Sequence, residues 1–159
     1  MPMLLRTVRQ NRWYKADAAP FLEKDDVPAD SVNDLITTGN LLSVWILTDD
    51  RSNLERVVRA VAVGRSHIDN AGYVVFDSTA VENAGIEMLE NIGESPDAEA
   101  NAWHRDLSLS GNKMVALAKA ILRDGESGQV LKVRMRELVD EGVQQGHLPA
   151  DVQKKFQKK

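Results

Sequence analysis

The sequence predicts an α/β or α+β fold in which a small mixed, partly parallel sheet packs against about four helices. An apolar run at 41–48, a helical pattern at 52–67 and a second apolar run at 73–76 follow one another as a β-α-β unit. Such a crossover joins parallel strands with right-handed sense. Two further amphipathic segments, at 110–124 and 127–145, supply helices that can cover the sheet.

The composition is that of one globular domain spanning residues 1–159. The chain has 43% hydrophobic and 28% charged residues, which is ordinary for a protein that folds around a core. It contains no cysteine, which excludes disulfides, a thiolate nucleophile and a zinc or iron–sulfur site built on sulfur. No apolar run approaches membrane-spanning length or a signal-peptide core, so we expect a cytoplasmic protein without a membrane partner.

Charge is distributed unevenly along the chain. The net charge is −4, yet residues 1–15 carry four cations and no acid, and the last six residues carry four lysines. The segment 16–149 between them holds 12 basic and 23 acidic residues. We therefore expect an acidic body with basic, frayed ends at 1–12 and 150–159. An acidic body repels phosphate backbones, which favours a protein partner over nucleic acid.

The signals that precede the β-α-β unit are weaker. Alternation over 3–8 predicts an edge strand. The stretch 15–31 holds two prolines and five acids, which is typical of an irregular, solvated connection. A short helix is expected at its end, over 29–36, and Gly39 closes it.

The β-α-β unit itself has clear boundaries. The run LLSVWILT at 41–48 is nearly continuous apolar sequence, as in a central strand buried on both faces. Ser52 with Glu55 three residues later forms a capping box, which predicts a helix over 52–67. Turn residues then lead into the short apolar strand at 73–76.

Beyond the second strand, the patterns favour helices. A third strand is expected at 86–89, and a short helix at 95–103. Ser110 is the predicted N-cap of a good amphipathic helix. The segment 127–145 predicts a last long helix, although alternating apolar residues leave open whether 128–136 is strand or helix.

Three carboxylates follow the two strands of the β-α-β unit. Asp49 and Asp50 come after the first strand and Asp77 after the second. Carboxyl ends of parallel strands meet at one sheet edge, where these oxygens could hold Mg²⁺. The segment VWILTDDRSNLERVVRAV resembles the first strand, acidic pair and first helix of phosphoacceptor receiver domains. The alternative is that all three residues begin or cap turns.

A second motif contains His104 and Asp106. The sequence HRDL at 104–107 matches the start of the protein-kinase catalytic loop, but the asparagine that should follow is one position late, at Asn112. His104 or Asp106 is the candidate catalytic base. The alternative is a polar loop between helices in which both side chains make caps and surface contacts.

The basic N-terminal segment is a candidate contact for nucleic acid or a partner. It interleaves four cations with aromatic residues, a composition found where proteins hold single strands by charge and stacking. The alternative is that the charges protect an edge strand from aggregation. The candidate residues are Arg6, Arg9, Arg12, Trp13 and Lys15.

Two functional hypotheses follow. The first is a small binding or regulatory module that contacts another protein through its acidic body, without catalysis and without a cofactor. The second is a metal-dependent phosphoryl or phosphodiester-cleaving enzyme that binds Mg²⁺ through the strand-end carboxylates. The sequence leaves the enzyme question uncertain, leaning towards no activity, and leaves the oligomeric state open.

Overall fold

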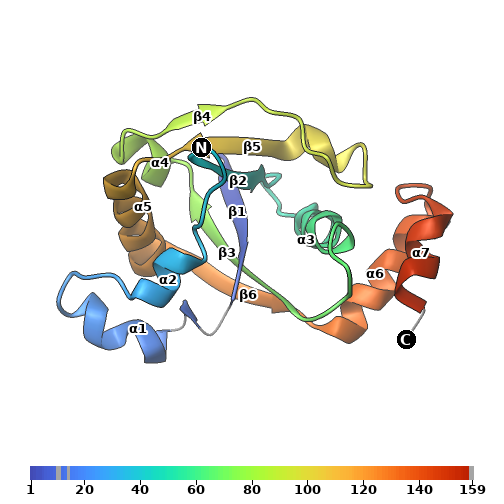
Figure 1. Ribbon diagram of the computed structural model, residues 1–159, viewed down its shortest axis with the longest axis horizontal. Coiled ribbons are helices and arrows are strands. Elements are labelled where there is room, and N and C mark those ends of the chain that lie inside the picture. Colours follow the sequence, from blue (N-terminus) through green and yellow to red (C-terminus); the bar gives the residue numbers. More distant parts are fainter. Residues whose placement is uncertain (10–11, 14, 158–159) are drawn as a thin grey trace.

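The protein forms a twisted six-stranded sheet with helices on both faces (Figure 1). The computed structural model describes residues 1–9, 12–13 and 15–157. The strand order is β4-β5-β2-β1-β3-β6, and every hydrogen-bonded pair is antiparallel. The strands are β1 (Met3–Val8), β2 (Leu41–Ile46), β3 (Ala71–Asp77), β4 (Glu87–Leu89), β5 (His104–Ser108) and β6 (Glu126–Val130).

Seven α-helices occur in the described residues, against the four or so that we expected. They are α1 (Lys15–Leu22), α2 (Ala29–Asn33), α3 (Leu54–Val63), α4 (Thr79–Asn83), α5 (Gly111–Asp124), α6 (Lys132–Gln144) and α7 (Ala150–Gln157). A 3-10 turn, η2 (Ala100–Trp103), precedes β5.

The predicted mixed, partly parallel sheet is wrong, because β1 lies between the two strands of the β-α-β unit. Leu4 is paired with Ile46 of β2 on one side and with Phe76 of β3 on the other. Since β1 is antiparallel to both, β2 and β3 do run in the same direction, but they are not hydrogen-bonded to each other. The edge-strand prediction for residues 3–8 is therefore also wrong: this strand is central.

The two faces of the sheet form separate cores. Neighbouring side chains of a strand point to opposite faces, so Leu5 packs with Val58 of α3 and Met135 of α6. Leu4 packs on the other face with Leu117 of α5. Figure 1 shows α3, α6 and α7 on one side of the sheet and α1, α2, α4 and α5 on the other. All five of these core side chains are fully buried, so the sheet is the middle layer of three.

Several local expectations are also corrected. The helix α1 lies in the stretch expected to be irregular, with Pro20 inside it. The predicted helix at 95–103 is a loop followed by η2 alone. The polar loop predicted around His104 is the strand β5. Before α6 the chain forms β6, so residues 128–130 are strand and residues from 132 onward are helix. By contrast, the Ser110 cap is confirmed: its side chain accepts a hydrogen bond from the Lys113 N–H.

A buried ion cluster joins α3 to α6 and to the loop before β5. The Asp97 side chain is fully buried and accepts two hydrogen bonds of 2.8 Å from Arg56 and one of 2.7 Å from Arg59. The Ala100 N–H donates a fourth at 3.1 Å. Arg59 also donates to the Leu138 carbonyl of α6 at 3.2 Å. The carboxylate thus joins α3 to the loop before β5, and Arg59 extends the cluster to α6.

Hydrogen bonding keeps Asp97 ionised in spite of its burial. Burial alone would raise the pKa of this carboxyl, but hydrogen bonds from Arg56, the Ala100 N–H and Arg59 outweigh it and lower the pKa to about 2. Removing one partner of a buried ion pair strongly destabilises the folded protein, because the remaining charge stays buried without a counter-charge.

We expect Asp97→Asn to lower the free energy of unfolding by roughly 3 to 5 kcal/mol, because the buried Arg59 guanidinium loses its counter-charge and the partly buried Arg56 keeps Glu99 alone. Urea unfolding followed by circular dichroism measures this. Glu99→Gln is the control, since Glu99 also pairs with Arg56 but its side chain is 73% exposed; it should change the stability by less than about 1 kcal/mol. Equal losses in the two variants would contradict the assigned role.

The pH dependence of stability tests the same cluster. The folded-state pKa of Asp97, about 2, lies below the ordinary value of 3.8. Its contribution, roughly 2 kcal/mol, is therefore present above about pH 4 and lost as the pH falls through 2. The difference in unfolding free energy between the wild type and Asp97→Asn should shrink by about 1.5 kcal/mol between about pH 6 and pH 2.5. A constant difference would show that Asp97 does not titrate in this range.

Candidate functional site

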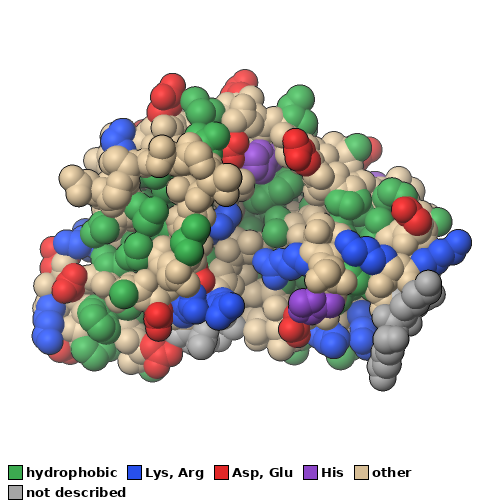
Figure 2. Space-filling model, in the orientation of Figure 1, with side chains coloured by type: hydrophobic (Ala, Val, Ile, Leu, Met, Phe, Trp, Pro, Cys, Tyr) green, Lys and Arg blue, Asp and Glu red, His purple; other side chains and the backbone are tan. Residues whose placement is uncertain are grey.

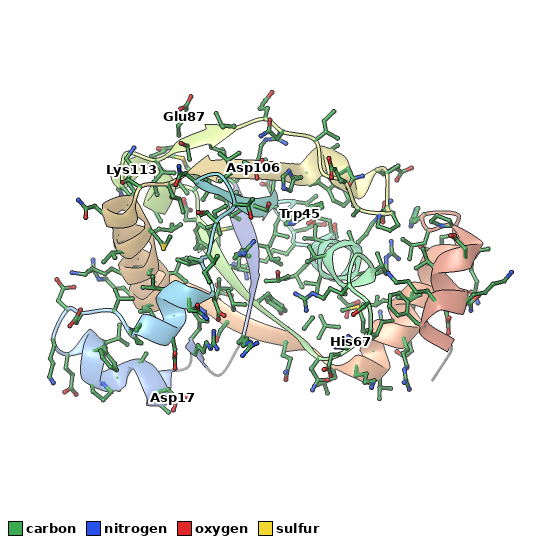
Figure 3. The ribbon with its side chains drawn as sticks, viewed as in Figure 1. Asp17, Trp45, His67, Glu87, Asp106 and Lys113 are labelled. Carbon is green, nitrogen blue, oxygen red and sulfur yellow. The ribbon has the colours of Figure 1, made fainter. Side chains whose placement is uncertain are left out.

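A cleft of about 880 Å³ opens where β1 ends. Its walls are the end of β1 with the residues that follow it, the end of α2, and the loop between α3 and β3. Figure 2 shows this face of the molecule hollowed near its middle, with Lys and Arg side chains on either side. In Figure 3, His67 lies on the loop below α3, which forms one wall of the cleft.

The cleft is basic although the protein as a whole is acidic. Four arginines line it against two aspartates, which leaves a surplus of two positive charges with His67 neutral. The arginines come from β1, from the segment after β1 and from the loop after α3, so chain segments far apart in the sequence build the positive surface. The charged residues are Arg6, Arg9, Arg12, Arg65, Asp34 and Asp69.

Asp34 at the end of α2 organises one wall. Its Oδ1 accepts a hydrogen bond of 2.9 Å from Arg12 Nη1, and its Oδ2 accepts bonds from the Trp13 indole at 3.0 Å and from the Arg9 backbone N–H at 2.9 Å. Both carboxylate oxygens are therefore engaged by the segment that follows β1. Asp34 holds this segment in place and neutralises one guanidinium at most.

Arg6 lies in the sheet where β1 and β2 separate. The Cα pairing of these two strands covers Leu4 and Leu5 alone, whereas β1 pairs with β3 along all six residues. In the gap, Arg6 Nη1 donates to the Ser43 carbonyl of β2 at 3.0 Å, and Nη2 donates to the Asp34 carbonyl at 3.4 Å. The guanidinium thus replaces part of the missing β1–β2 ladder.

The charge of Arg6 is poorly compensated. Its partners are carbonyl oxygens, and among the described residues Nε is buried with no hydrogen-bond partner. Burial lowers the pKa of Arg6 below its ordinary value; Asp34 opposes this shift, and nearby Arg65 adds to it. A largely desolvated cation beside a second cation creates a strong positive potential in the cleft.

Both walls contribute cationic side chains that are not paired with an acid among the described residues. Within the described part of the chain, neither Arg65 nor the Arg9 side chain forms an ion pair, although both line the cleft. The His67 ring contacts the Ser66 hydroxyl through Nδ1 at 3.1 Å. These side chains are available to a ligand.

The structure brings together most of the basic residues proposed from the sequence. Arg6, Arg9 and Arg12 all line the cleft. Trp13 does not present a stacking surface, because it is only 6% exposed and packs in the core beside α5. Lys15 is the first residue of α1, and its side chain lies outside the described atoms. Sequence reasoning missed Arg65, which no motif distinguishes from other arginines at helix ends.

Asp50 and Asp77, two of the proposed metal ligands, accept hydrogen bonds from residues two positions away in their own turns. Asp50 accepts hydrogen bonds from the Ser52 N–H at 3.0 Å and the Thr48 hydroxyl at 2.8 Å, and these bonds lower its pKa to about 2. Asp77 accepts a hydrogen bond from the Thr79 N–H at 2.8 Å, which lowers its pKa. Among the described residues, Asp49 included, no three His, Asp or Glu side chains form a group that could hold a metal ion.

His104 and Asp106 do lie together, on one face of β5 (Figure 3 labels Asp106). His104 Nε2 is 3.6 Å from Asp106 Oδ1, while Nδ1 is 2.8 Å from the Asn91 carbonyl. Asp106 also accepts bonds from the Ser43 hydroxyl at 3.2 Å and the Asn91 amide at 2.8 Å. The serine faces the carboxylate and not the imidazole, so this geometry does not activate it. The network fastens the loop before η2 to the sheet.

Comparisons with protein-family models, with curated proteins and with solved structures find no match. Within the described residues, the helices are all too short or too polar to span a bilayer. The cleft geometry is therefore the basis for the functional argument.

We expect Asp34→Ala to release the segment that follows β1, because three hydrogen bonds to one carboxylate disappear. Hydrogen bonds to charged groups contribute about 1.5 to 3 kcal/mol each, so exchange of the Trp13 indole proton should accelerate at least tenfold. Proton NMR resolves this indole signal. Asp30→Ala, in the exposed first turn of the same helix, is the control and should leave the exchange rate unchanged. Unchanged exchange in Asp34→Ala would show that the core packing of Trp13 holds the segment alone.

Proposed function

We propose that this protein is a binding module that recognises an anionic group of its ligand or partner through the basic cleft. The observation that carries the proposal is the gathering of four arginines from separate chain segments around one cleft. The proposal keeps the binding function expected from the sequence. It moves the recognition surface from the acidic body to the cleft.

The electrostatics of the cleft support this function. Arg6 is largely buried against carbonyl groups, and Arg65 lies near enough to lower its pKa. Like charges held together destabilise the protein until an anion binds between them, so an anion should stabilise the folded state. A concave basic surface on an otherwise acidic molecule also steers anions towards itself.

The chemistry of the lining favours binding over catalysis. Arginine stays protonated at neutral pH, so it donates hydrogen bonds without exchanging protons. Asp34 already accepts hydrogen bonds on both oxygens from the segment beside it. The cleft is equipped to hold an anion in place.

We expect saturable amide chemical-shift changes at Thr7, Asn70 and Gln129 when the protein is titrated at low salt with sulfate, phosphate or hexaglutamate. The double variant Arg9→Ala/Arg65→Ala should weaken binding of the tightest probe at least tenfold, because both guanidinium donors are removed. Arg136→Ala is the matched control: Arg136 is exposed on α6 and lies outside the cleft.

Two results would count against the proposal. One is the absence of saturable changes at the cleft with all three anions. The other is an equal loss of affinity in Arg136→Ala, which would indicate general attraction to a charged surface. Thermal unfolding of each variant without ligand shows whether it remains folded.

A further inference from the structure

We infer that the anion recognised by this cleft is a phosphate monoester, carried either by a small molecule or by a phosphorylated side chain; this inference rests on the binding function proposed above. Three features support it: the charge of the cleft, the directions from which donors approach, and the donors that are fixed before a ligand arrives. The first two features separate a phosphate monoester from a carboxylate or a phosphodiester, and the third favours tight binding of the anion that they select.

The first feature is the charge balance. The cleft holds a surplus of two positive charges. A phosphate monoester carries about −1.5 to −2 at neutral pH, which matches that surplus, whereas a carboxylate or a phosphodiester carries one negative charge and would leave a cation uncompensated. The match matters most at Arg6, whose guanidinium is desolvated and has carbonyl partners only.

The second feature is that cationic donors come from both walls. Arg9 and Arg12 belong to the segment after β1, and Arg65 and His67 belong to the loop after α3. A planar carboxylate is satisfied by one guanidinium fork. A phosphate monoester has three terminal oxygens pointing in different directions, so it can accept hydrogen bonds from both walls at once.

The third feature is that part of the site is already fixed before a ligand arrives. Arg12 is held by Asp34, and Arg6 is held by the Ser43 carbonyl. Asn70 uses its side-chain oxygen to accept a 2.7 Å hydrogen bond from the Lys132 N–H at the start of α6. The amide NH₂ of Asn70 has no hydrogen-bond partner among the described residues, and it can only donate. Fixed donors reduce the entropy lost on binding.

The rest of the cleft indicates what the phosphate is attached to. A volume of about 880 Å³ exceeds that of a phosphate group alone and lies within the usual range for organic ligands. Asn33 and Gln129 offer neutral hydrogen-bonding groups, and Ile36, 63% exposed, offers one apolar contact. We therefore expect a polar organic portion, such as a hydroxylated small molecule or a short peptide.

The test compares phosphate monoesters with other anions by isothermal titration calorimetry at constant ionic strength. The monoester probes are glycerol 3-phosphate and a phosphoserine peptide, each compared with its unphosphorylated form. The other anions are dimethyl phosphate, succinate, hexaglutamate and a single-stranded oligonucleotide. At least one monoester should bind ten times more tightly than each of these. The stronger of the two monoesters identifies the source as a metabolite or a phosphoprotein.

Variants of Arg65 then test whether the preference for phosphate monoesters arises in the cleft. Arg65→Ala should reduce monoester affinity at least tenfold while Arg136→Ala leaves it unchanged. Arg65→Lys keeps the charge but not the planar fork, so it should lose at least threefold; this second variant keeps the test decisive if Arg65→Ala unfolds.

The outcomes separate the inference from the proposed function. Equal or tighter binding of any of the four other anions overturns the phosphate-monoester assignment and leaves anion binding intact. Failure of every probe to bind overturns both. An equal loss in Arg65→Ala and Arg136→Ala places the phosphate elsewhere on the surface and overturns the assigned site.

Discussion

The position of β1 between β2 and β3 is the constraint on which the rest of the structure depends. A strand with neighbours on both sides and helices on both faces must bury side chains in both directions, and Leu4 and Leu5 meet that requirement. After Leu5 the strand remains paired with β3 and separates from β2. Arg6 occupies the point of separation, so the feature that completes the sheet also places a cation at the cleft.

Arginine is used in two contrasting ways in this molecule. Arg56 and Arg59 saturate one buried carboxylate, which yields a neutralised link between α3, α6 and the loop before β5. Arg6 is also largely buried, but it meets carbonyl dipoles only. Burying a cation that is not directly bonded to a carboxylate is costly, and Asp34 offsets that cost only through space. Because of this contrast, we regard Arg56 and Arg59 as structural and the arginines of the cleft as the ligand-binding group of our proposal.

The sequence predicts individual elements better than their arrangement. The apolar run at 41–46 is a strong signal because a strand buried on both faces needs nearly continuous apolar sequence. The pattern of α3 and α5 is equally strong because one apolar stripe recurs at the helical period. Periodicity does not indicate which strands are neighbours, so the position of β1 between β2 and β3 could not be predicted. The strand β5 was missed because it carries the polar residues His104 and Asp106 on one face. Their hydrogen-bond partners, Ser43 and Asn91, lie elsewhere in the sequence and come close only in the folded protein. The same limit hid Arg65, which joins the cleft only through the tertiary fold, whereas Arg6, Arg9 and Arg12 could be proposed from their clustering.

The central place of β1 also divides the sheet in an unexpected way. On one side stand β4, β5 and β2, on the other β3 and β6, and across the described strands each half is hydrogen-bonded to the other through β1 alone. β1 precedes both partners in the sequence, so its first neighbour requires residues 41–46 and its second requires residues 71–77. The two half-sheets are themselves built from strands far apart in the sequence, since Leu41 pairs with Ser108 and Ala71 pairs with Val130. The whole sheet therefore depends on long-range pairing, and β1 is the strand that joins its two halves into a single cooperative unit.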